Sequence, residues 1–192
     1  AGMGLTRFMR VAGERSGRSF STYADLHAFS VEDPAAFWKI LWDESNVKGD
    51  PGTAPYARDL DRMPGAKFFP DGRLNVAENM LARDGDGDAL VFWGEDKVKR
   101  RVSWSDLRRQ VAQLQTLLKE IGVKPAERVA AMMPNMPESI VGLTATASIG
   151  ATWSSCSPDF RVQGVLDRFG QIEPKVGVET GQPIVGAILF PI

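Results

Sequence analysis

Apolar residues repeat at helical spacing in separate stretches of the first 65 residues, which predicts helices joined by loops. Thr22, with Asp25 three residues later, matches a capping box, so we expect a short helix through Phe29. Asp33 followed by Pro34 predicts another helix start, with an N-cap and then proline in the first turn. The apolar sets on the two flanking helices are Leu5, Phe8, Met9 and Ala12, then Phe37, Trp38, Leu41 and Trp42.

The next part of the chain predicts a connector, a short helix and a hairpin. Residues 46–66 hold three prolines and three glycines, so we expect an extended, packed connector. A short helix is expected over residues 74–83. Two strand-like runs, 88–93 and 97–104, are joined by Gly-Glu-Asp at 94–96, which predicts a β-hairpin.

A long amphipathic helix is predicted after the hairpin. Ser103 and Asp106 match a second capping box, and Gly122 is expected to end the helix. Apolar residues form a stripe at spacings of four, three, four and three: Leu107, Val111, Leu114, Leu118 and Ile121.

From Arg128 onward the pattern alternates strand, helix, strand and helix. The run 128–133 has no charge in its interior, which is typical of a buried parallel strand, and 151–155 predicts a second strand. Crossovers of this length predict right-handed connections in a parallel sheet. The expected fold class is therefore α/β, with a helical N-terminal region followed by the first, incomplete part of a parallel-sheet domain.

The two helices of this alternating region have recognisable start signals. Asn135 is expected to be the N-cap of the first helix, and Gly150 is expected to end it. Ser157 followed by Pro158 predicts the start of the second helix, which should end near Gly170.

Composition narrows the function classes. The 192 residues, 43% hydrophobic and 24% charged, fit one globular domain with an appendage. A net charge of −1 disfavours nucleic acid or an anionic membrane as a partner, and no apolar run is long enough to span a bilayer. No secretory signal is seen, and Cys156 is the only cysteine, so we expect no internal disulfide and a reducing, cytoplasmic location.

Four acidic residues match part of a calcium-loop template. Asp84, Asp86, Asp88 and Glu95 stand at positions one, three, five and twelve. Ala89 occupies the position where the loop needs glycine, and a strand rather than a helix follows. We therefore expect a polar turn here and assign no metal ligand.

Other candidate residues are also better explained by packing or solvation. His27 is the only histidine and has no nucleophile near it in sequence, and Cys156 lacks a partner cysteine or base. The run 97–101 (KVKRR) has the charge to bind phosphate, but such a run in a hairpin is more typical of a solvated strand edge. Trp38 and Trp42 share a helix face and are expected to lie in the core.

No phosphate-binding motif is present. The sequence contains neither GxxxxGK[ST] nor GxGxxG, no loop rich in Ser, Thr and Gly, and no lysine in a catalytic context. The residues by themselves therefore assign no catalytic group.

Several segments resemble the short-chain acyl-CoA synthetases of the adenylate-forming superfamily. YADLHAFSVEDPAAFWKILWD (23–43) is similar to their N-terminal cap region, and MPGAKFFPDGRLNVAENML (63–81) to the segment that leads into the adenylate-forming domain. VSWSDLRRQVAQL and RVAAMMPNMPESIVGLTATASIGATWSSCSPDF look most like the acetoacetyl-CoA synthetases. WSSCSPDF (153–160) separates the subfamilies best, because acetyl-specific enzymes usually carry a Gly-Gly pair near its Pro-Asp. The likeness covers residues 5–176.

This resemblance implies an acetoacetate–CoA ligase that works in two steps. The carboxylate of acetoacetate attacks the α-phosphate of ATP, giving acyl-adenylate and pyrophosphate, and the thiol of CoA then displaces AMP. ATP, CoA and Mg²⁺ are implied for the full-length family, where Mg²⁺ and cationic groups offset phosphate charge. The family's phosphate loop, adenine-binding motif and adenylation lysine lie downstream of the matching segments, and none is present here.

Pro158 and Asp159 are the only site residues that the resemblance carries over. The equivalent turn in relatives lies near the channel for the pantetheine of CoA. Arg161 departs from the family pattern, which has a small residue there.

The resemblance divides the chain into three parts. Residues 1–80 match the cap region, residues 81–176 match the start of the AMP-binding domain, and residues 177–192 (GVETGQPIVGAILFPI) form a divergent tail. We expect the tail to reflect a truncation, with a divergent but genuine terminus as the alternative. An incomplete sheet leaves apolar surface uncovered, and domain stability is only about 5–15 kcal/mol, so the chain alone is expected to be marginally folded and inactive.

Two other functions stay open at this point. One is a ligase for acetate, propionate or another short acid. The other is a non-catalytic module that binds a partner or CoA through the cap region.

Overall fold

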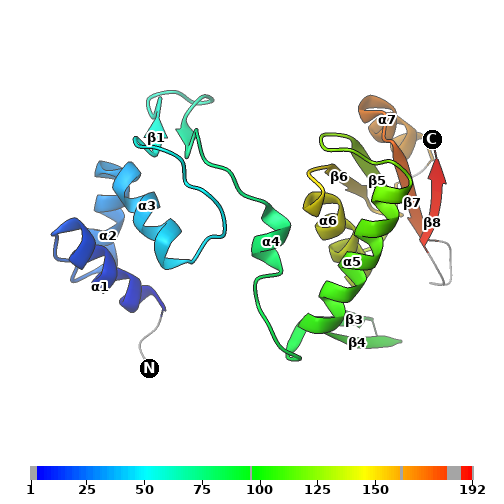
Figure 1. The fold of residues 1–192 in the computed structure, drawn as a ribbon, viewed down its shortest axis with the longest axis horizontal. Coiled ribbons are helices and arrows are strands. Elements are labelled where there is room, and N and C mark those ends of the chain that lie inside the picture. Colours follow the sequence, from blue (N-terminus) through cyan, green and yellow to red (C-terminus); the bar gives the residue numbers. More distant parts are fainter. Residues whose placement is uncertain (1–3, 96, 161, 181–186, 192) are drawn as a thin grey trace. The chain divides into compact units, whose positions relative to one another are not determined.

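The computed structural model describes residues 4–95, 97–160, 162–180 and 187–191. The chain folds as two compact units, residues 1–74 and residues 75–192, which are treated separately below (Figure 1).

Three helices form the first unit: α1 (Gly4–Ser16), α2 (Tyr23–Glu32) and α3 (Pro34–Glu44). Their apolar faces meet around Phe29, which is 1% exposed. The remaining buried members of this core are Ala12, Leu26 and Ile40. The periodicity of the sequence predicted this helical region correctly.

The predicted caps of α2 and α3 are confirmed. The Thr22 hydroxyl accepts from the Asp25 backbone N–H, while the Asp25 carboxylate accepts from the Thr22 N–H, which completes the capping box. The Asp33 carboxylate accepts from the Ala36 N–H, and Pro34 takes the first helical position. Helix ends without such partners would leave backbone donors unpaired.

The connector after α3 carries a two-residue ladder between β1 (Ala57–Arg58) and β2 (Lys67–Phe68), and an isolated antiparallel bridge joins Asp50 to Arg73. It lies against the aromatic face of α3, where Trp38 meets Phe68. The expectation that this tryptophan lies in the core is wrong, because the residue is 40% exposed. A two-residue ladder supplies too little surface to cover the ring.

The second unit begins with the short helix α4 (Val76–Met80), which is shorter than the helix predicted over residues 74–83. The Asn75 side-chain oxygen caps it by accepting from the Ala77 N–H. The Asn75 amide nitrogen donates to the carbonyls of Ala147 and Ser148, at 3.1 and 3.2 Å. One side chain therefore caps α4 and ties it to a later helix.

A two-stranded antiparallel hairpin follows, made of β3 (Asp88–Gly94) and β4 (Val98–Ser103), as predicted. It leads into α5 (Trp104–Glu120), whose predicted stripe is buried at Leu107, Val111 and Leu118.

Two details of α5 differ from the prediction. Ile121 is 42% exposed, because the helix ends one residue before it. The cap is half a capping box: the Ser103 hydroxyl accepts from the Asp106 N–H but donates to the Asp106 carboxylate itself.

A four-stranded sheet forms the centre of the second unit, in the order β6–β5–β7–β8. Its strands are β5 (Arg128–Met132), β6 (Thr152–Cys156), β7 (Val176–Thr180) and β8 (Ala187–Pro191). β5 pairs in parallel with both β6 and β7, and β8 adds an antiparallel edge to β7. The parallel α/β class is confirmed, and β7 continues from residue 176 into the segment 177–192.

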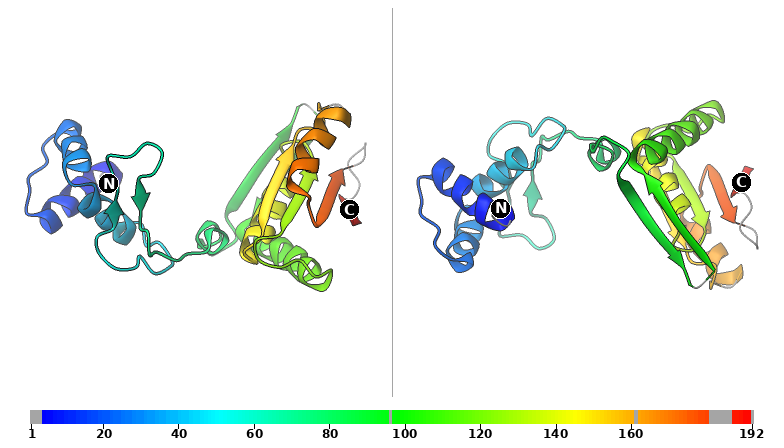
Figure 2. Two further views of the ribbon diagram at one scale, coloured as in Figure 1. Left: turned by 90° about the horizontal axis from the view of Figure 1, so that it is seen from above. Right: turned by 90° about the horizontal axis from the view of Figure 1, so that it is seen from below.

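Helices cover both faces of this sheet. α5 and α6 (Pro137–Ser148) lie on one face, and α7 (Val162–Ile172) lies on the other (Figure 2). Residues alternate between the faces of a strand, so Val129 and its parallel partner Trp153 both point toward α6.

Glycine lets α6 approach the sheet closely. A Cβ on Gly142 would lie only 2.4 Å from Cη2 of Trp153. The indole of Trp153 therefore occupies the space that any other side chain at position 142 would need.

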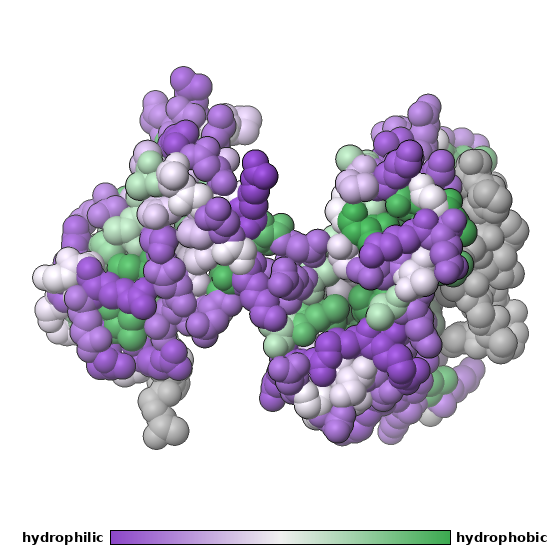
Figure 3. Space-filling model, in the orientation of Figure 1, coloured by the Kyte–Doolittle hydropathy of each residue, from purple (hydrophilic) through white to green (hydrophobic). Residues whose placement is uncertain are grey.

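No described helix is long and apolar enough to cross a bilayer. Each unit nevertheless shows hydrophobic residues at its surface among hydrophilic ones (Figure 3). The exposed apolar side chains include Leu60, Met63, Trp93 and Leu166.

Candidate functional site

The strand order places a topological switch point at the carboxyl ends of β5 and β7. The connection from β5 leads to β6 on one side, while β7 lies on the other side of β5. Open parallel sheets bind ligands in the crevice outside such carboxyl ends. The residues directly after β7 lie outside the described part of the chain, so we build the candidate site from the described segments that follow β5 and its neighbour β6.

The segment after β5 is anchored to the core of the unit by two buried methionines. Met133 and Met136 are 6% and 5% exposed, and the Met133 N–H donates to the Cys156 carbonyl at 3.1 Å. The prediction that Asn135 caps α6 is wrong: Met136 is the N-cap and supplies no side-chain bond. Pro137 takes the first helical position and forces an extended conformation on the residue before it.

An ion pair ties the start of α6 to the hairpin. The Arg100 guanidinium donates to both carboxylate oxygens of Glu138, each at 2.7 Å. Burial raises the pKa of Glu138, but the hydrogen bonds from Arg100, a hydrogen bond from the backbone N–H of Glu138 itself and the charge of Arg100 together outweigh burial, so the net pKa lies below its usual value.

Sequence reasoning missed this pair. The sequence pattern predicted Arg100 only as part of a solvated strand edge and assigned no role to Glu138. The two residues lie 38 positions apart, so no local spacing signals their contact.

The turn after β6 carries the two residues assigned by resemblance. Pro158 and Asp159 are exposed there, and the Ser157 hydroxyl donates to the Asp159 carboxylate at 2.8 Å. The predicted helix start at Ser157–Pro158 is wrong, because α7 begins at Val162. The Phe160 N–H donates to the Ser157 carbonyl and closes a separate turn that precedes α7. The departure noted at residue 161 lies outside the described residues.

The single cysteine and the single histidine lie in different surroundings, and neither lies in the candidate site as a paired nucleophile and base. Cys156 is buried at the end of β6, and burial raises the pKa of its thiol against the opposing effect of Arg168. The burial of Cys156 agrees with the packing role expected from the sequence. His27 is exposed on α2 in the first unit, and its ring lies 6.2 Å from that of Tyr23.

The acidic residues of the calcium-loop pattern contact separate donors. The Asp86 carboxylate accepts from the Ser105 hydroxyl, Asp88 pairs with Arg101, and Asp84 lies 3.4 Å from Arg108. Within the described parts of the chain, no three acidic, histidine or cysteine side chains group around a common point.

The basic run of β4 is largely engaged within the unit. Arg101 pairs with Asp88, and the Lys99 ammonium lies 4.7 Å from the Trp93 ring centroid. Because Arg100 already holds Glu138, its guanidinium is not open to a phosphate group.

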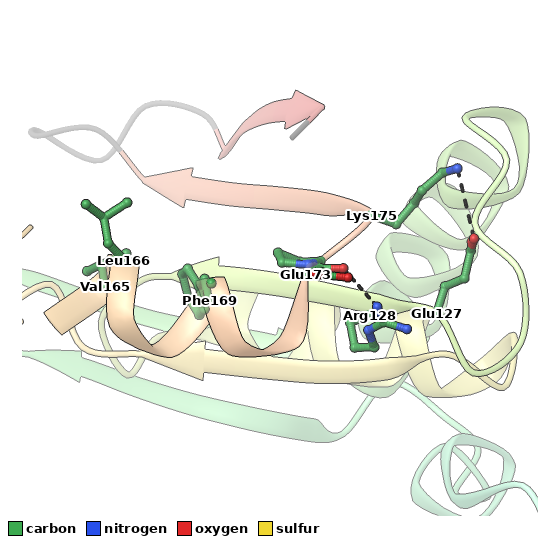
Figure 4. A pocket seen from close by; sticks show the side chains of 9 residues that line it. Glu127, Arg128, Val165, Leu166, Phe169, Glu173 and Lys175 are labelled. Carbon is green, nitrogen blue, oxygen red and sulfur yellow. Dashed lines mark hydrogen bonds and ion pairs between the residues drawn. The ribbon is translucent and has the colours of Figure 1, made fainter. Parts of the chain in front are cut away.

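A cavity of about 620 Å³ lies at the opposite, amino-terminal edge of the parallel strands (Figure 4). Its apolar wall comes from α7, and its rim carries the charged residues Glu127, Arg128, Glu173 and Lys175. Arg128 donates to the Ile172 and Glu173 carbonyls, and Lys175 lies 3.9 Å from Glu127. These bonds fix the C-terminal end of α7. They account for the positions of Arg128 and Lys175 without a bound ligand.

The first unit has an apolar cleft of about 490 Å³ between α3 and the connector. Trp38 and Phe68 form part of its wall and are 40% and 48% exposed. The other lining residues are Leu41, Trp42, Ser45, Val47, Phe69 and Leu74. Such a cleft can bind an apolar group but carries no catalytic side chain.

The carboxyl edge therefore supplies a positioned turn and a braced helix start. The described residues there include no group of three acidic, histidine or cysteine side chains that could hold a metal ion.

Comparisons with known proteins extend this picture. The profile described as "AMP-binding enzyme" matches residues 77–187, and that described as "Acetyl-coenzyme A synthetase N-terminus" matches residues 23–80. An acetoacetyl-coenzyme A synthetase from Rhizobium meliloti (strain 1021) is 54% identical over 172 residues, covering 90% of this chain and 26% of the relative. An acetoacetyl-CoA synthetase from Macaca fascicularis is 37% identical over 178 residues, with the same coverage of both chains.

A solved structure agrees with these sequence matches. Acetoacetyl-CoA synthetase from Streptomyces lividans superposes with a TM-score of 0.84 at 40% identity, over 91% of this chain and 28% of that one. The chain thus spans about a quarter of the length of the proteins it matches.

Proposed function

This chain belongs to the AMP-binding enzyme family, and from that premise we propose that it is the N-terminal part of an acetoacetate–CoA ligase. The observation that carries the proposal is its likeness to acetoacetyl-CoA synthetases over nine-tenths of its length, in both sequence and fold. The proposed reaction of the whole enzyme converts ATP, acetoacetate and CoA to acetoacetyl-CoA, AMP and pyrophosphate.

Each part of the chain has a place in this proposal. Residues 1–80 serve as the cap region, residues 81–176 as the start of the AMP-binding domain, and residues 177–192 as its divergent tail. The turn at Pro158 and Asp159 faces the CoA channel, and its position at the carboxyl end of β6 supports that role. We place the enzyme in the cytoplasm, with support from the unpaired thiol of Cys156.

The described residues do not fit a nucleotide with its Mg²⁺ ion. They contain no group of three acidic, histidine or cysteine side chains that converge on one point, and the sequence has no phosphate loop. ATP binding and adenylation therefore depend on chain that follows the matched quarter of the relatives.

It follows that residues 1–192 alone are catalytically silent. Pyrophosphate–ATP exchange with acetoacetate should stay at the level of a blank containing no protein. Exchange well above that blank would contradict this part of the proposal.

A chimera tests the ligase assignment itself. Residues 5–176 would replace the matching quarter of the Rhizobium meliloti relative, with the intact relative as the positive control. We expect acetoacetate-dependent AMP release within about tenfold of the intact relative. A folded chimera that forms no adenylate would show that this chain does not serve as the N-terminal part of such an enzyme.

Two alternatives have their own readouts. If the enzyme instead uses acetate or propionate, its complete form should release AMP faster with those acids than with acetoacetate. The aromatic cleft of the first unit favours a second candidate, a non-catalytic module that binds a partner through the cap region. That candidate requires residues 1–192 to melt cooperatively and to remain a single species in solution, whereas aggregation would count against it.

A further inference from the structure

A small cavity of about 120 Å³ lies between the sheet, α5 and α6. It is separate from the turn after β6 and from the cavity at the amino-terminal edge. Eight of its ten lining residues are apolar or glycine: Leu114, Leu118, Val129, Met133, Val141, Gly142, Trp153 and Val178. The other two are Glu138 and Thr146.

One buried hydroxyl in its wall has no partner. Thr146 is 0% exposed, and its Oγ1 makes no hydrogen bond. Thr144, two residues earlier on α6 and 1% exposed, instead donates to the Ile140 carbonyl at 2.6 Å. A buried hydroxyl without a partner bears the full cost of desolvation, so a group that bonds to Thr146 would remove that cost.

Glu138, the other polar residue that lines the cavity, already has a partner. Both Glu138 oxygens accept from Arg100, so this carboxylate has its charge partner outside the cavity. A charged ligand would therefore enter an apolar space without a counter-ion, which is strongly unfavourable.

We propose that this cavity binds a small uncharged molecule with an apolar body and one hydroxyl group, which bonds to Thr146. The apolar wall takes the body of the ligand, and Thr146 supplies the single hydrogen bond. A dry cavity of about 150 Å³ holds benzene, so a volume of about 120 Å³ fits a ligand of roughly five heavy atoms.

A ligand in this cavity would affect the candidate site, because two residues that line the cavity also belong to that site. Met133 begins the segment after β5, and Glu138 lies in the first turn of α6. A ligand that fills the space beneath them restrains both, without touching the turn at Pro158.

The test compares two probes of the same shape, 2-methylpropan-1-ol and 2-methylbutane. The first has a hydroxyl group where the second has a methyl group. Their binding to the full 192-residue chain would be followed by titrating the methyl NMR signals of Val129, Met133 and Val141. The key variant is Thr146→Val, which keeps the shape and removes the hydroxyl. Thr146→Ser, which keeps the hydroxyl, and Thr144→Val, at the bonded neighbour, serve as controls.

We expect saturable shifts with the alcohol in the natural chain. Thr146→Val should weaken alcohol binding by about 3- to 10-fold, the value of one hydrogen bond, and should not weaken alkane binding. Thr146→Ser and Thr144→Val should keep the natural preference. Two results would overturn the proposal: no saturable shift with the alcohol, or equal losses of alcohol and alkane binding in Thr146→Val.

Discussion

Glu138 has surroundings that the sequence alone does not predict. It opens α6 as a first-turn acid should, but it also receives two hydrogen bonds from a strand arginine. About a third of each side chain is exposed, so the pair contributes modestly to stability.

The Glu138 pair gives a pH-dependent prediction. Glu138→Gln should lower the free energy of unfolding by no more than about 1 kcal/mol at neutral pH. The folded-state pKa lies below the usual 4.5, so the natural chain keeps this stabilisation above that value and loses it as the pH falls through the lowered pKa. Urea unfolding of the two proteins should therefore converge in acid.

A matched control separates this effect from general acid sensitivity. Glu120→Gln removes an exposed carboxylate at the end of α5 and should leave the pH dependence unchanged. A gap between natural chain and Glu138→Gln that stays constant down to acid pH would contradict the ion-pair explanation.

Asp159 carries a prediction for the complete enzyme. In the chimera described above, Asp159→Asn should raise the KM for CoA by about 2- to 10-fold, with a smaller effect on kcat, because an amide accepts the Ser157 hydroxyl less strongly than a carboxylate and so loosens the turn beside the proposed channel. Asp167→Asn, at an exposed carboxylate on α7 bonded to Gln163, should leave the KM for CoA unchanged. Equal effects of the two changes would remove support for this site.

At this scale, prediction succeeded where a residue acts on its own neighbours. Thr22 and Asp33 cap helices as their spacing indicated. Asn135 does not, because a proline two residues later moved the cap to Met136, a residue with no capping side chain. Bonds between distant residues, such as Arg100 with Glu138, leave no local signal.

At the scale of elements, the contact between α6 and β6 rests on one glycine. Gly142→Ala places a methyl group against the Trp153 ring, whose edge cannot bend away, so the free energy of unfolding should fall by about 1–3 kcal/mol. Gly170→Ala, on α7 with no atom within 4 Å of the added carbon, should instead be neutral or stabilising by about 0.5–1 kcal/mol.

Chemical denaturation of both glycine variants tests the close approach directly. Adding Trp153→Phe to Gly142→Ala should recover part of the loss, because the smaller ring leaves room for the methyl group. If Gly142→Ala is as stable as the natural chain, α6 does not lie as close to the sheet as described.

Elements were predictable in proportion to their periodicity. α5 has a long apolar stripe, and its bounds were found nearly to the residue. α7 was placed too early, because serine followed by proline also opens the isolated turn that precedes it. The pairing of β7 with β5 could not be derived from spacing, since strand order depends on contacts between distant segments.

At the scale of the whole molecule, the division into two units predicts separate responses to mutation. Thr22→Ala removes the capping hydroxyl of α2 and should destabilise the first unit by about 1 kcal/mol. Amide hydrogen exchange should quicken in residues 4–74 and stay unchanged in the central strands of the second unit. Ser21→Ala, beside the cap, should change neither.

Loss of protection in both units would mean that they unfold together. That outcome would contradict the independence expected from two separate cores, one centred on Phe29 and the other on the sheet.

The position of β5 between β6 and β7 also sets an order of events during synthesis. β5 leaves the ribosome before either neighbour, and β6 reaches it after one crossover. Its other edge must wait until α6, β6 and α7 have emerged and β7 arrives. During that interval an apolar strand presents unpaired backbone groups to any other extended chain nearby. The nascent protein therefore passes through a stage in which slow translation or low chaperone supply favours mispairing at β5, before any catalytic property is relevant.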